Sequence, residues 1–325
     1  MRAVQITAFG SLSGLTLQDI PALVPGPDQV LVRVDAAAIN PSDVKNAQGL
    51  MPHTHLPRTP GRDFAGTVVA GHSALLRAEV WGTGGDLGFA QDGTHAEFVL
   101  VSRQAVCLKP THLSMEQAGS VGVPFVTAWC GLMDAAQLTA HDTVLVIGAA
   151  GAVGSATVQI ANWKGARVLG TVRQEAQADG VRTLGADVVL TASGDDLPAQ
   201  VQAATEGRGA DVIVDTVGGA MLEPCLKSLA PLGRLVEIST KERRVEFDLL
   251  DFYRRELRLL GVNTLSRDAA MCARILQALA AGFETGALHP PPIVARYGLG
   301  QAREAYEQVA NGASGKVVLL PGQAG

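Results

Sequence analysis

The sequence lacks an excess of positive charge, and this absence argues against one large class of proteins. Its 325 residues include 26 Lys and Arg against 31 Asp and Glu, so the formal net charge at pH 7 is −5. Proteins that bind nucleic acid usually present a strongly basic face to the phosphates. We therefore expect neither nucleic acid nor a membrane as a partner.

Cysteine is scarce, and no targeting segment is evident. The four cysteines lie far apart without any C-x-x-C spacing, so neither a disulfide framework nor a structural zinc motif is expected. The first ten residues contain no apolar run long enough for a signal peptide, which predicts a cytoplasmic protein.

The chain is long enough to form two domains, and its composition is 47% hydrophobic. The first hundred residues have little helical periodicity and contain short β-favouring runs separated by Gly and Pro, which predicts a mostly antiparallel, barrel-like domain. The runs are residues 4–8, 15–20, 30–36, 66–70 and 95–101. Loops at 21–28, 49–61 and 82–93 are available for function.

The pattern changes near residue 113. Ser114 and Gln117 form a capping box that begins a helix, and strands then alternate with helices as in a parallel sheet covered on both faces. Strands are expected at 143–147, 167–172, 187–190, 211–215, 234–238 and 257–262. Ser266 is expected to cap a helix that ends near residue 281, and the remaining strands at 293–296 and 317–320 are expected to rejoin the first domain.

Residues 143–165 contain the most specific local motif. A β-branched run ends at Gly148, and an amphipathic helix follows from Ala152. Gly151 and Gly154 occupy the last two places of a G-x-G-x-x-G fingerprint, while Ala149 stands at the first. The stretch predicts a dinucleotide pyrophosphate at the helix start; the alternatives are a merely structural turn or a membrane span, which the glycines and polar residues disfavour.

Several segments, in order along the chain, resemble the medium-chain dehydrogenase/reductase superfamily, specifically its zinc-free quinone oxidoreductase-like branch. They are Asn-Pro-Ser-Asp at 40–43, Pro-Gly-Arg-Asp-Phe-Ala-Gly at 60–66, Gly-Thr-His-Ala-Glu-Phe at 93–98, Ala-Ala-Gly-Ala-Val-Gly at 149–154 and Gly-Lys-Val-Val-Leu at 315–319. The resemblance implies an α/β fold in which a Rossmann doubly wound parallel sheet is inserted into a GroES-like β-barrel domain. The implied domains are 1–119 (GroES-like, catalytic), 120–263 (Rossmann, NADPH-binding) and 264–325 (the C-terminal return that completes the catalytic domain). It also implies a homodimer.

Zinc is not expected. The family's zinc-dependent alcohol dehydrogenases place a cysteine where Asn40 stands and a His-Glu pair where Arg62 and Asp63 stand. His53 and His55 share a Pro-rich loop without a third ligand, so we expect them to be solvated or to face substrate rather than to bind metal. In this setting Asp63 is expected to be a buried structural acid.

The cofactor prediction depends on the end of the second strand of the nucleotide domain. NAD-binding proteins usually carry an acidic residue there, whereas this chain has Arg173, which would form charge-assisted hydrogen bonds to the 2′-phosphate of NADPH. Nearby Glu175 weakens that preference, NADH remains possible, and a plain surface arginine is the alternative. Further cofactor contacts are predicted at Asn40, Thr127, Ala150, Gly151, Ala152, Val153, Gly154, Thr171, Val217, Ile238 and Ser239.

The predicted reaction is zinc-independent hydride transfer from NADPH to a quinone or an α,β-unsaturated carbonyl. Lys45 is the candidate that would stabilise the developing enolate, with a solvated lysine as the alternative. Asn40 is expected to orient the nicotinamide ribose or substrate, and Asp43 to hold the loop or to balance Lys45. Two other functions remain open: a zinc-type alcohol dehydrogenase, and a non-catalytic NADPH-binding sensor or crystallin-like protein.

Overall fold

The computed structural model describes residues 1–51, 53–191 and 194–323, which divide into two compact units. Unit 1 comprises Met1–Val126, Thr264–Gly286 and Pro290–Gly325, and unit 2 comprises Thr127–Asn263 and Ala287–His289. The domain limits given above at 119/120 and 263/264 stay predictions.

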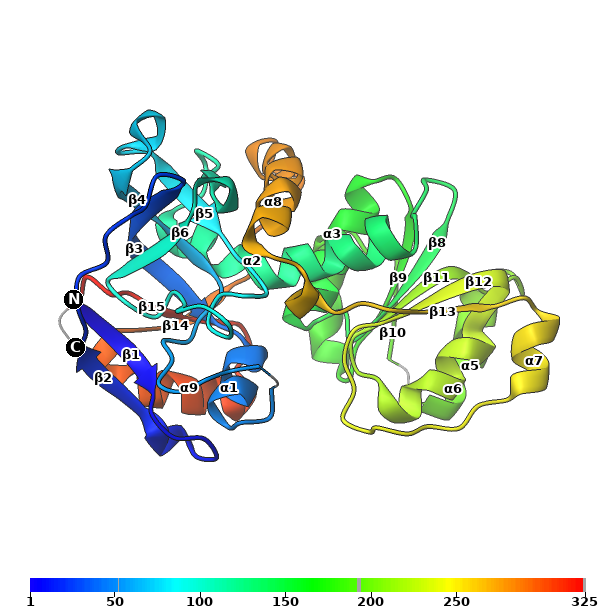
Figure 1. Ribbon diagram of the computed structural model, residues 1–325. Helices are drawn as coiled ribbons and strands as arrows, with labels where there is room; N and C mark the ends of the chain where they lie inside the picture. The colour runs from blue at the N-terminus through cyan, green and yellow to red at the C-terminus, as the bar shows by residue number, and fades with distance from the viewer. Residues whose placement is uncertain (52, 192–193, 324–325) are drawn as a thin grey trace. The chain divides into compact units, whose positions relative to one another are not determined.

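Unit 1 is built on a mostly antiparallel sheet of seven strands, in which strand β3 pairs with three neighbours (Figure 1). The order is β14-β15-β3-β4-β5-β7, with β6 also on β3, and a separate hairpin is formed by β1 and β2. Their bounds are β1 Arg2–Ile6, β2 Leu15–Asp19, β3 Gln29–Ile39, β4 Phe64–Gly71, β5 Glu79–Gly82, β6 Phe98–Ser102, β7 Cys107–Leu108, β14 Ile293–Tyr297 and β15 Lys316–Leu319. The mostly antiparallel arrangement predicted for this part of the chain is confirmed.

Strand β3 pairs the C-terminal strand β15 with the sheet formed by the first part of the chain. Its residues from Val30 to Val34 alternate between buried and more exposed positions, because one face of the strand packs into a core of Val30, Val32, Val34 and Phe64. Its last residues are buried on both faces, and there Val317 of β15 pairs antiparallel with Ile39. This register places Lys316 beside Asn40, and both residues belong to the candidate site.

The helices of unit 1 are α1 Pro41–Ala47, the first part of α2 Met115–Trp129, α8 Ala269–Glu284 and α9 Ala302–Ala310. Helix α1 was not predicted from the sequence. The predicted Ser114–Gln117 capping box is present, with each side chain accepting from the other residue's backbone N–H. The prediction that Ser266 caps α8 was wrong. The cap is Asp268, whose side chain accepts from Met271 N at 2.7 Å, and the helix begins at the next residue, Ala269.

Unit 2 is a parallel, doubly wound sheet of six strands in the order β10-β9-β8-β11-β12-β13 (Figure 1), which confirms the Rossmann prediction. The strands are β8 Thr143–Ile147, β9 Arg167–Thr171, β10 Val188–Leu190, β11 Ala210–Asp215, β12 Leu229–Glu237 and β13 Arg258–Gly261. The helices are the end of α2, a π-helical turn Cys130–Ala135, α3 Ala152–Trp163, α4 Ala178–Thr183, α5 Leu197–Ala204, α6 Leu222–Ser228 and α7 Leu249–Arg254. In such a sheet, ligands bind where the strand order reverses, here beyond β8 and β11.

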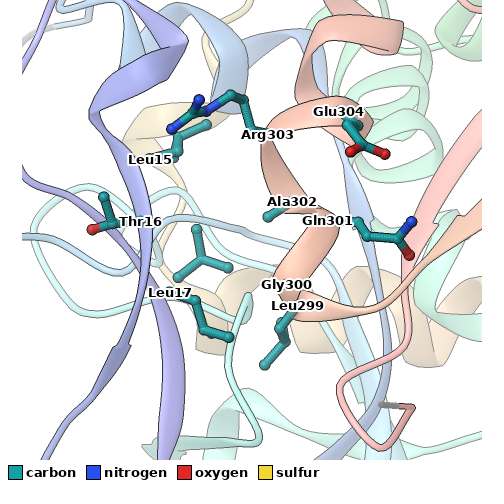
Figure 2. A pocket seen from close by; sticks show the side chains of 10 residues that line it. Leu15, Thr16, Leu17, Leu299, Gly300, Gln301, Ala302, Arg303 and Glu304 are labelled. Atoms are coloured by element: carbon teal, nitrogen blue, oxygen red, sulfur yellow. The ribbon is translucent and has the colours of Figure 1, made fainter. Parts of the chain in front are cut away.

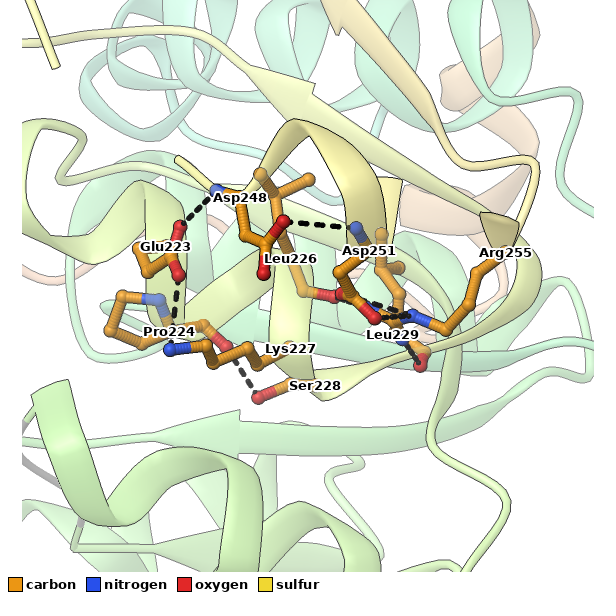
Figure 3. A network of polar contacts seen from close by, with 9 residues as sticks. All are labelled: Glu223, Pro224, Leu226, Lys227, Ser228, Leu229, Asp248, Asp251 and Arg255. Atoms are coloured by element: carbon orange, nitrogen blue, oxygen red, sulfur yellow. Dashed lines mark hydrogen bonds and ion pairs between the residues drawn. The ribbon is translucent and has the colours of Figure 1, made fainter. Parts of the chain in front are cut away.

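A polar network links α6 to the residues at the two ends of α7 (Figure 3). Glu223 accepts from Asp248 N at 3.1 Å, and Asp248 in turn caps α7 by accepting from Asp251 N. Arg255 donates to the carbonyls of Leu226 and Leu229 and pairs with Asp251. These contacts fix the segment between β12 and β13, whose beginning lines the candidate site.

Among the described helices, none combines the length and the apolar character that crossing a bilayer requires.

Candidate functional site

The turn after β8 has the shape of a phosphate cradle. Gly148 adopts a positive φ of 74° and turns the chain out of the strand, and Gly151 caps α3 with an extended backbone. Gly154 lies in the first turn of α3, where a Cβ would stand 2.1 Å from the Gly148 carbonyl oxygen. Only glycine allows this approach of helix to turn. The close approach involves Gly148, which lies just before the fingerprint.

The start of α3 leaves donors open to a ligand. Ala150, Gly151 and Ala152 are exposed, and the first helical hydrogen bond runs from Ser155 N to Gly151 O at 2.8 Å. The N–H groups ahead of Ser155 in the helix have no partner four residues back and sit at the positive end of the dipole. This exposed backbone therefore favours the binding of an anion. The next two residues, Val153 and Gly154, are more buried.

Thr171 shapes the same turn rather than facing solvent. It is 6% exposed, and its hydroxyl accepts from Gly148 N at 3.0 Å while its carbonyl accepts from Ala149 N at 2.9 Å. Two residues later, Arg173 is exposed at the end of β9. The repulsion expected from Glu175 is reduced, because that carboxylate accepts from Thr191 at 2.6 Å and lies 3.9 Å from Arg182.

The ends of β11 and β12 carry the other predicted contacts of this unit. Asp215 is buried and accepts from Val217 N at 2.8 Å and Gly218 N at 3.0 Å, so its carboxylate shapes the turn that leaves Val217 half exposed. On the neighbouring strand, Ile238 and Ser239 line a cavity of 390 Å³. Thr127 is 7% exposed in α2, at the beginning of unit 2.

Two carboxyl groups meet at this edge of the sheet, and the sequence analysis missed them as a pair. Burial, followed by the charge of Asp215 and a hydrogen bond with it, raises the pKa of Glu237 to about 7. Burial also raises the pKa of Asp215. Glu237 lines the 390 Å³ cavity, so a group that titrates near neutrality borders the predicted nicotinamide side.

In unit 1 the three predicted catalytic residues occupy very different surroundings. Asn40 is 2% exposed and caps α1, and Asp43, 1% exposed, accepts from Asn40 N at 2.8 Å in a capping box. Burial, opposed mainly by that hydrogen bond, raises the pKa of Asp43 to about 7. Lys45 is exposed on α1. Asp43 therefore belongs to the buried side of this helix, and the suggestion that it balances Lys45 finds no support in its contacts.

A buried polar network surrounds Asn40. Its amide nitrogen donates to Asp63 Oδ2 at 2.9 Å, and its amide oxygen accepts from Lys316 Nζ at 2.7 Å. Asp63 is 0% exposed and accepts from Val123 N at 2.8 Å through its other oxygen. Arg62 lies beside it, donating to Gly84 O at 2.9 Å. Asp63 is thus a buried acid, and Lys316 joins the site from the opposite end of the chain.

His95 and Tyr306 extend this network into the core. His95 Nδ1 lies 2.8 Å from the Tyr306 hydroxyl, and Nε2 lies 3.4 Å from Ala38 O. The carbonyl requires a proton on Nε2, so the tyrosine donates to Nδ1 of a neutral ring. Burial lowers the pKa of His95 to about 4, in agreement with that assignment. The sequence analysis noted His95 only as part of a motif.

Other candidate features contribute less. A cavity of 380 Å³ lies between β2 and the start of α9 (Figure 2), and no predicted site residue lines it. His53 and His55 are exposed. Within residues 1–51, 53–191 and 194–323, no group of three His, Cys, Asp or Glu side chains is placed to hold a metal ion.

Known proteins resemble the chain over nearly its whole length. An alcohol dehydrogenase GroES-like domain model matches residues 26–111, and a zinc-binding dehydrogenase model matches residues 152–281. Human quinone oxidoreductase is 31% identical, covering 98% of both chains, and a zinc-type alcohol dehydrogenase-like protein of Schizosaccharomyces pombe is 40% identical over 84% of this chain and 81% of its own. The crystal structure of an NAD-dependent alcohol dehydrogenase superposes with a TM-score of 0.90 at 31% identity, covering 99% of this chain and 100% of the other. The chain belongs to the medium-chain dehydrogenase/reductase superfamily of oxidoreductases and is quinone oxidoreductase-like.

Proposed function

We propose that the protein is a zinc-independent, NADPH-dependent oxidoreductase that reduces quinones or α,β-unsaturated carbonyls by hydride transfer. The observation that carries the proposal is the start of α3, where Gly154 lies against the β8 turn and the first N–H groups of the helix, from Ala152 on, have no partner four residues back and can bind a pyrophosphate. Quinone oxidoreductases among the relatives support a small-molecule acceptor.

The nicotinamide supplies the hydride when the cofactor is bound. On this proposal the β8–α3 turn, from Ala150 to Gly154, holds the pyrophosphate, while Thr171 keeps that turn in shape. Val217, Ile238 and Ser239 at the ends of β11 and β12 would flank the nicotinamide half. Thr127 and Asn40 complete the predicted contacts.

Arg173 supports NADPH over NADH. Arg173 is exposed two residues beyond the second strand, where a 2′-phosphate would be recognised. Because one of the structural relatives is an NAD-dependent alcohol dehydrogenase, NADH remains the alternative cofactor. Cofactor preference is therefore measured directly, as kcat/KM for NADPH and for NADH with the same acceptor.

Lys45 is the residue proposed to stabilise the negative charge that develops on the substrate. Hydride addition to the β-carbon of an enone places negative charge on the carbonyl oxygen, and an exposed ammonium group would stabilise it. Asn40 would orient the cofactor or substrate from the buried network. Asp43, which is inaccessible to solvent, would act through the cap of α1 and not by contact with substrate.

Zinc independence rests on the chemistry of the side chains around Asn40. The amide offers a weak ligand in place of a thiolate, and the Asp63 carboxylate is already in contact with the ammonium of Lys316 at 3.5 Å. One relative is named as zinc-type, so metal content needs measurement. Stoichiometric zinc in the purified protein would refute this part of the proposal.

A homodimer is proposed through the edge strand β13. This strand pairs only with β12 among the described strands, and Leu259 on it is 42% exposed. Sedimentation velocity of the wild type and of Leu259→Lys tests the proposal: we expect a dimer that the substitution weakens.

Turnover decides between the enzyme and a non-catalytic NADPH-binding protein. The wild type, with NADPH, is assayed at 340 nm against 1,4-benzoquinone and an enone such as 1-octen-3-one. We expect acceptor-dependent loss of absorbance with at least one of them. NADPH binding without consumption across a wider panel of both substrate classes would favour a sensor.

A further inference from the structure

The lysine near the C-terminal end of the chain is unusually buried. The Gly-Lys-Val-Val-Leu segment at 315–319 forms β15, and its lysine is 4% exposed although lysine side chains are seldom buried. Lys316 Nζ lies 2.7 Å from Asn40 Oδ1 and 3.5 Å from Asp63 Oδ2. We propose that Lys316 is a positioning residue of the candidate site, which holds the Asn40 carboxamide in one orientation. The inference rests on the proposed function.

The orientation follows from the charges on either side of the amide. An ammonium group can only donate a hydrogen bond, and an ionised carboxylate can only accept one. Lys316 therefore requires the Asn40 oxygen and Asp63 the Asn40 nitrogen, as observed. Turning the amide by 180° would place donor against donor and acceptor against acceptor. The contact with Asp63 uses one of the two N–H groups of the amide.

Both partners of Asn40 are themselves rigidly held. Lys316 N donates to Pro292 O at 2.8 Å, and the next residue, Val317, pairs with Ile39 of β3. Asp63 accepts from Val123 N through one carboxylate oxygen, and its carbonyl accepts from Thr94 at 2.9 Å. A side chain fixed by supports of this kind is preorganised, which is what a cofactor- or substrate-orienting residue requires.

The same contacts anchor helix α1. Asn40 is the N-cap of α1, its backbone N–H donates to Asp43, and Lys45 lies in the last turn of the helix. The Lys316–Asn40 contact thus ties the C-terminal strand to the helix that carries Lys45. Lys316 touches neither cofactor nor substrate on this proposal, so its effect is exerted through Asn40.

Removing Lys316 alone gives an ambiguous result, because it leaves the Asp63 carboxylate buried without its cation. The informative variant is therefore Lys316→Met/Asp63→Asn, which removes both charges together. It relieves the unpaired charge and also removes the fixed orientation. Val123 N–H keeps the oxygen of the new amide at position 63, so the NH2 group of that amide faces Asn40 and disfavours the wild-type orientation of the Asn40 amide. Lys109→Met serves as the control, because Lys109 is another nearly buried lysine that lies 3.2 Å from a carboxylate, Glu79.

The test compares melting temperature with steady-state kinetics, using NADPH and 1,4-benzoquinone. We expect Lys316→Met to lower both the melting temperature and kcat. The double variant should regain most of the melting temperature while its kcat stays roughly ten- to a hundredfold below wild type. Lys109→Met should leave kcat unchanged. A double variant whose kcat recovers together with its melting temperature would show a merely structural role and overturn the proposal.

A second cycle tests the orientation without any turnover. Asn40→Asp places a carboxylate against Asp63, whereas Asn40→Asp/Asp63→Asn exchanges the two groups and restores a single carboxylate beside Lys316. We expect the exchange to recover most of the melting temperature lost in Asn40→Asp, and no recovery would refute the fixed orientation. If the wild type oxidises no NADPH, the proposed function fails, and this cycle decides the orientation separately.

Discussion

The two glycines at the start of α3 should respond in opposite ways to the addition of one methyl group. At Gly154 the new Cβ would lie 2.1 Å from the Gly148 carbonyl oxygen and 2.9 Å from the Ala149 Cα, closer than real Cβ contacts. Both are backbone atoms, so helix and turn must separate by about 1 Å in a close-packed interior. At Gly151 the nearest atom is 3.3 Å away and φ is −77°, which alanine accepts.

The magnitudes follow from this contrast. Overpacking costs about 1–3 kcal/mol, and Gly154→Ala belongs at the upper end because no side chain can rotate away. For a unit of this size, that loss lowers the melting temperature by roughly 10 °C. Gly151→Ala should change the free energy of unfolding by less than about 1 kcal/mol. Its methyl group would occupy the exposed surface offered to the pyrophosphate, so NADPH should bind at least about tenfold more weakly.

Thermal unfolding by circular dichroism and NADPH titration by calorimetry give the two readouts. Gly180→Ala is the control, since this exposed glycine of α4 has no atom within 4 Å of an added Cβ and a helical alanine stabilises by about 1 kcal/mol. A Gly154→Ala protein as stable as wild type would refute the packing argument. A Gly151→Ala protein that binds NADPH normally would remove the phosphate cradle from this turn.

Three further predictions concern single side chains. Arg173→Ala should raise the KM for NADPH by roughly tenfold or more and leave that for NADH within about twofold, because only the former carries a 2′-phosphate; equal effects in steady-state assays would contradict phosphate recognition. Lys45→Met should lower kcat for an enone by roughly a hundredfold while NADPH affinity measured by calorimetry stays normal; full turnover would remove Lys45 from the mechanism. Asp43 binds its proton more strongly in the folded state, with a pKa of about 7 against 3.8, so its contribution to stability is complete below pH 4 and is lost as pH rises toward 7. Urea unfolding at pH 5 and pH 8 tests this. The free energy of unfolding should fall less between pH 5 and pH 8 in Asp43→Asn than in wild type. An identical fall in the two proteins would show that Asp43 does not titrate in this range.

The nucleotide-binding half could be predicted from local sequence because its signals are local. Strand β8, the glycine turn and helix α3 follow one another within 21 residues, and each is indicated by its own residue types. Helix α1 was missed for the opposite reason. It is only seven residues long and begins Asn-Pro-Ser-Asp, which is equally typical of a turn. What decides for a helix is the packing of Val44 and Ala47 against Leu299, Ala302 and Tyr306, residues far along the chain.

The site was only partly predictable for the same reason. Asn40 and Asp43 were identified as candidates and Asp63 as a buried acid, but the lysine that contacts Asn40 and Asp63 lies 276 residues from Asn40. In the sequence, Lys316 precedes a short apolar strand and is typical of a solvated charge at a strand end. Only the pairing of β15 with β3 brings it into the interior. The Asp215–Glu237 pair was hidden likewise, because two adjacent parallel strands place their ends together.

The charged residues around Asn40 also differ from those of a zinc site. Arg62 and Lys316 bring two buried cations to this part of unit 1, and Asp63 and Asp43 bring two carboxyl groups. Because the pKa of Asp43 is raised to about 7, that carboxyl is neutral below pH 7 and the cluster then carries one net positive charge. A divalent cation would have to enter against that charge with an amide and one shared carboxylate as ligands, whereas zinc sites supply thiolates or neutral imidazoles. At position 40 this chain carries an amide rather than a thiolate, and Lys316 places positive charge next to the same amide oxygen. On our proposal that charge fixes the orientation of the Asn40 amide and so acts on the reaction through Asn40.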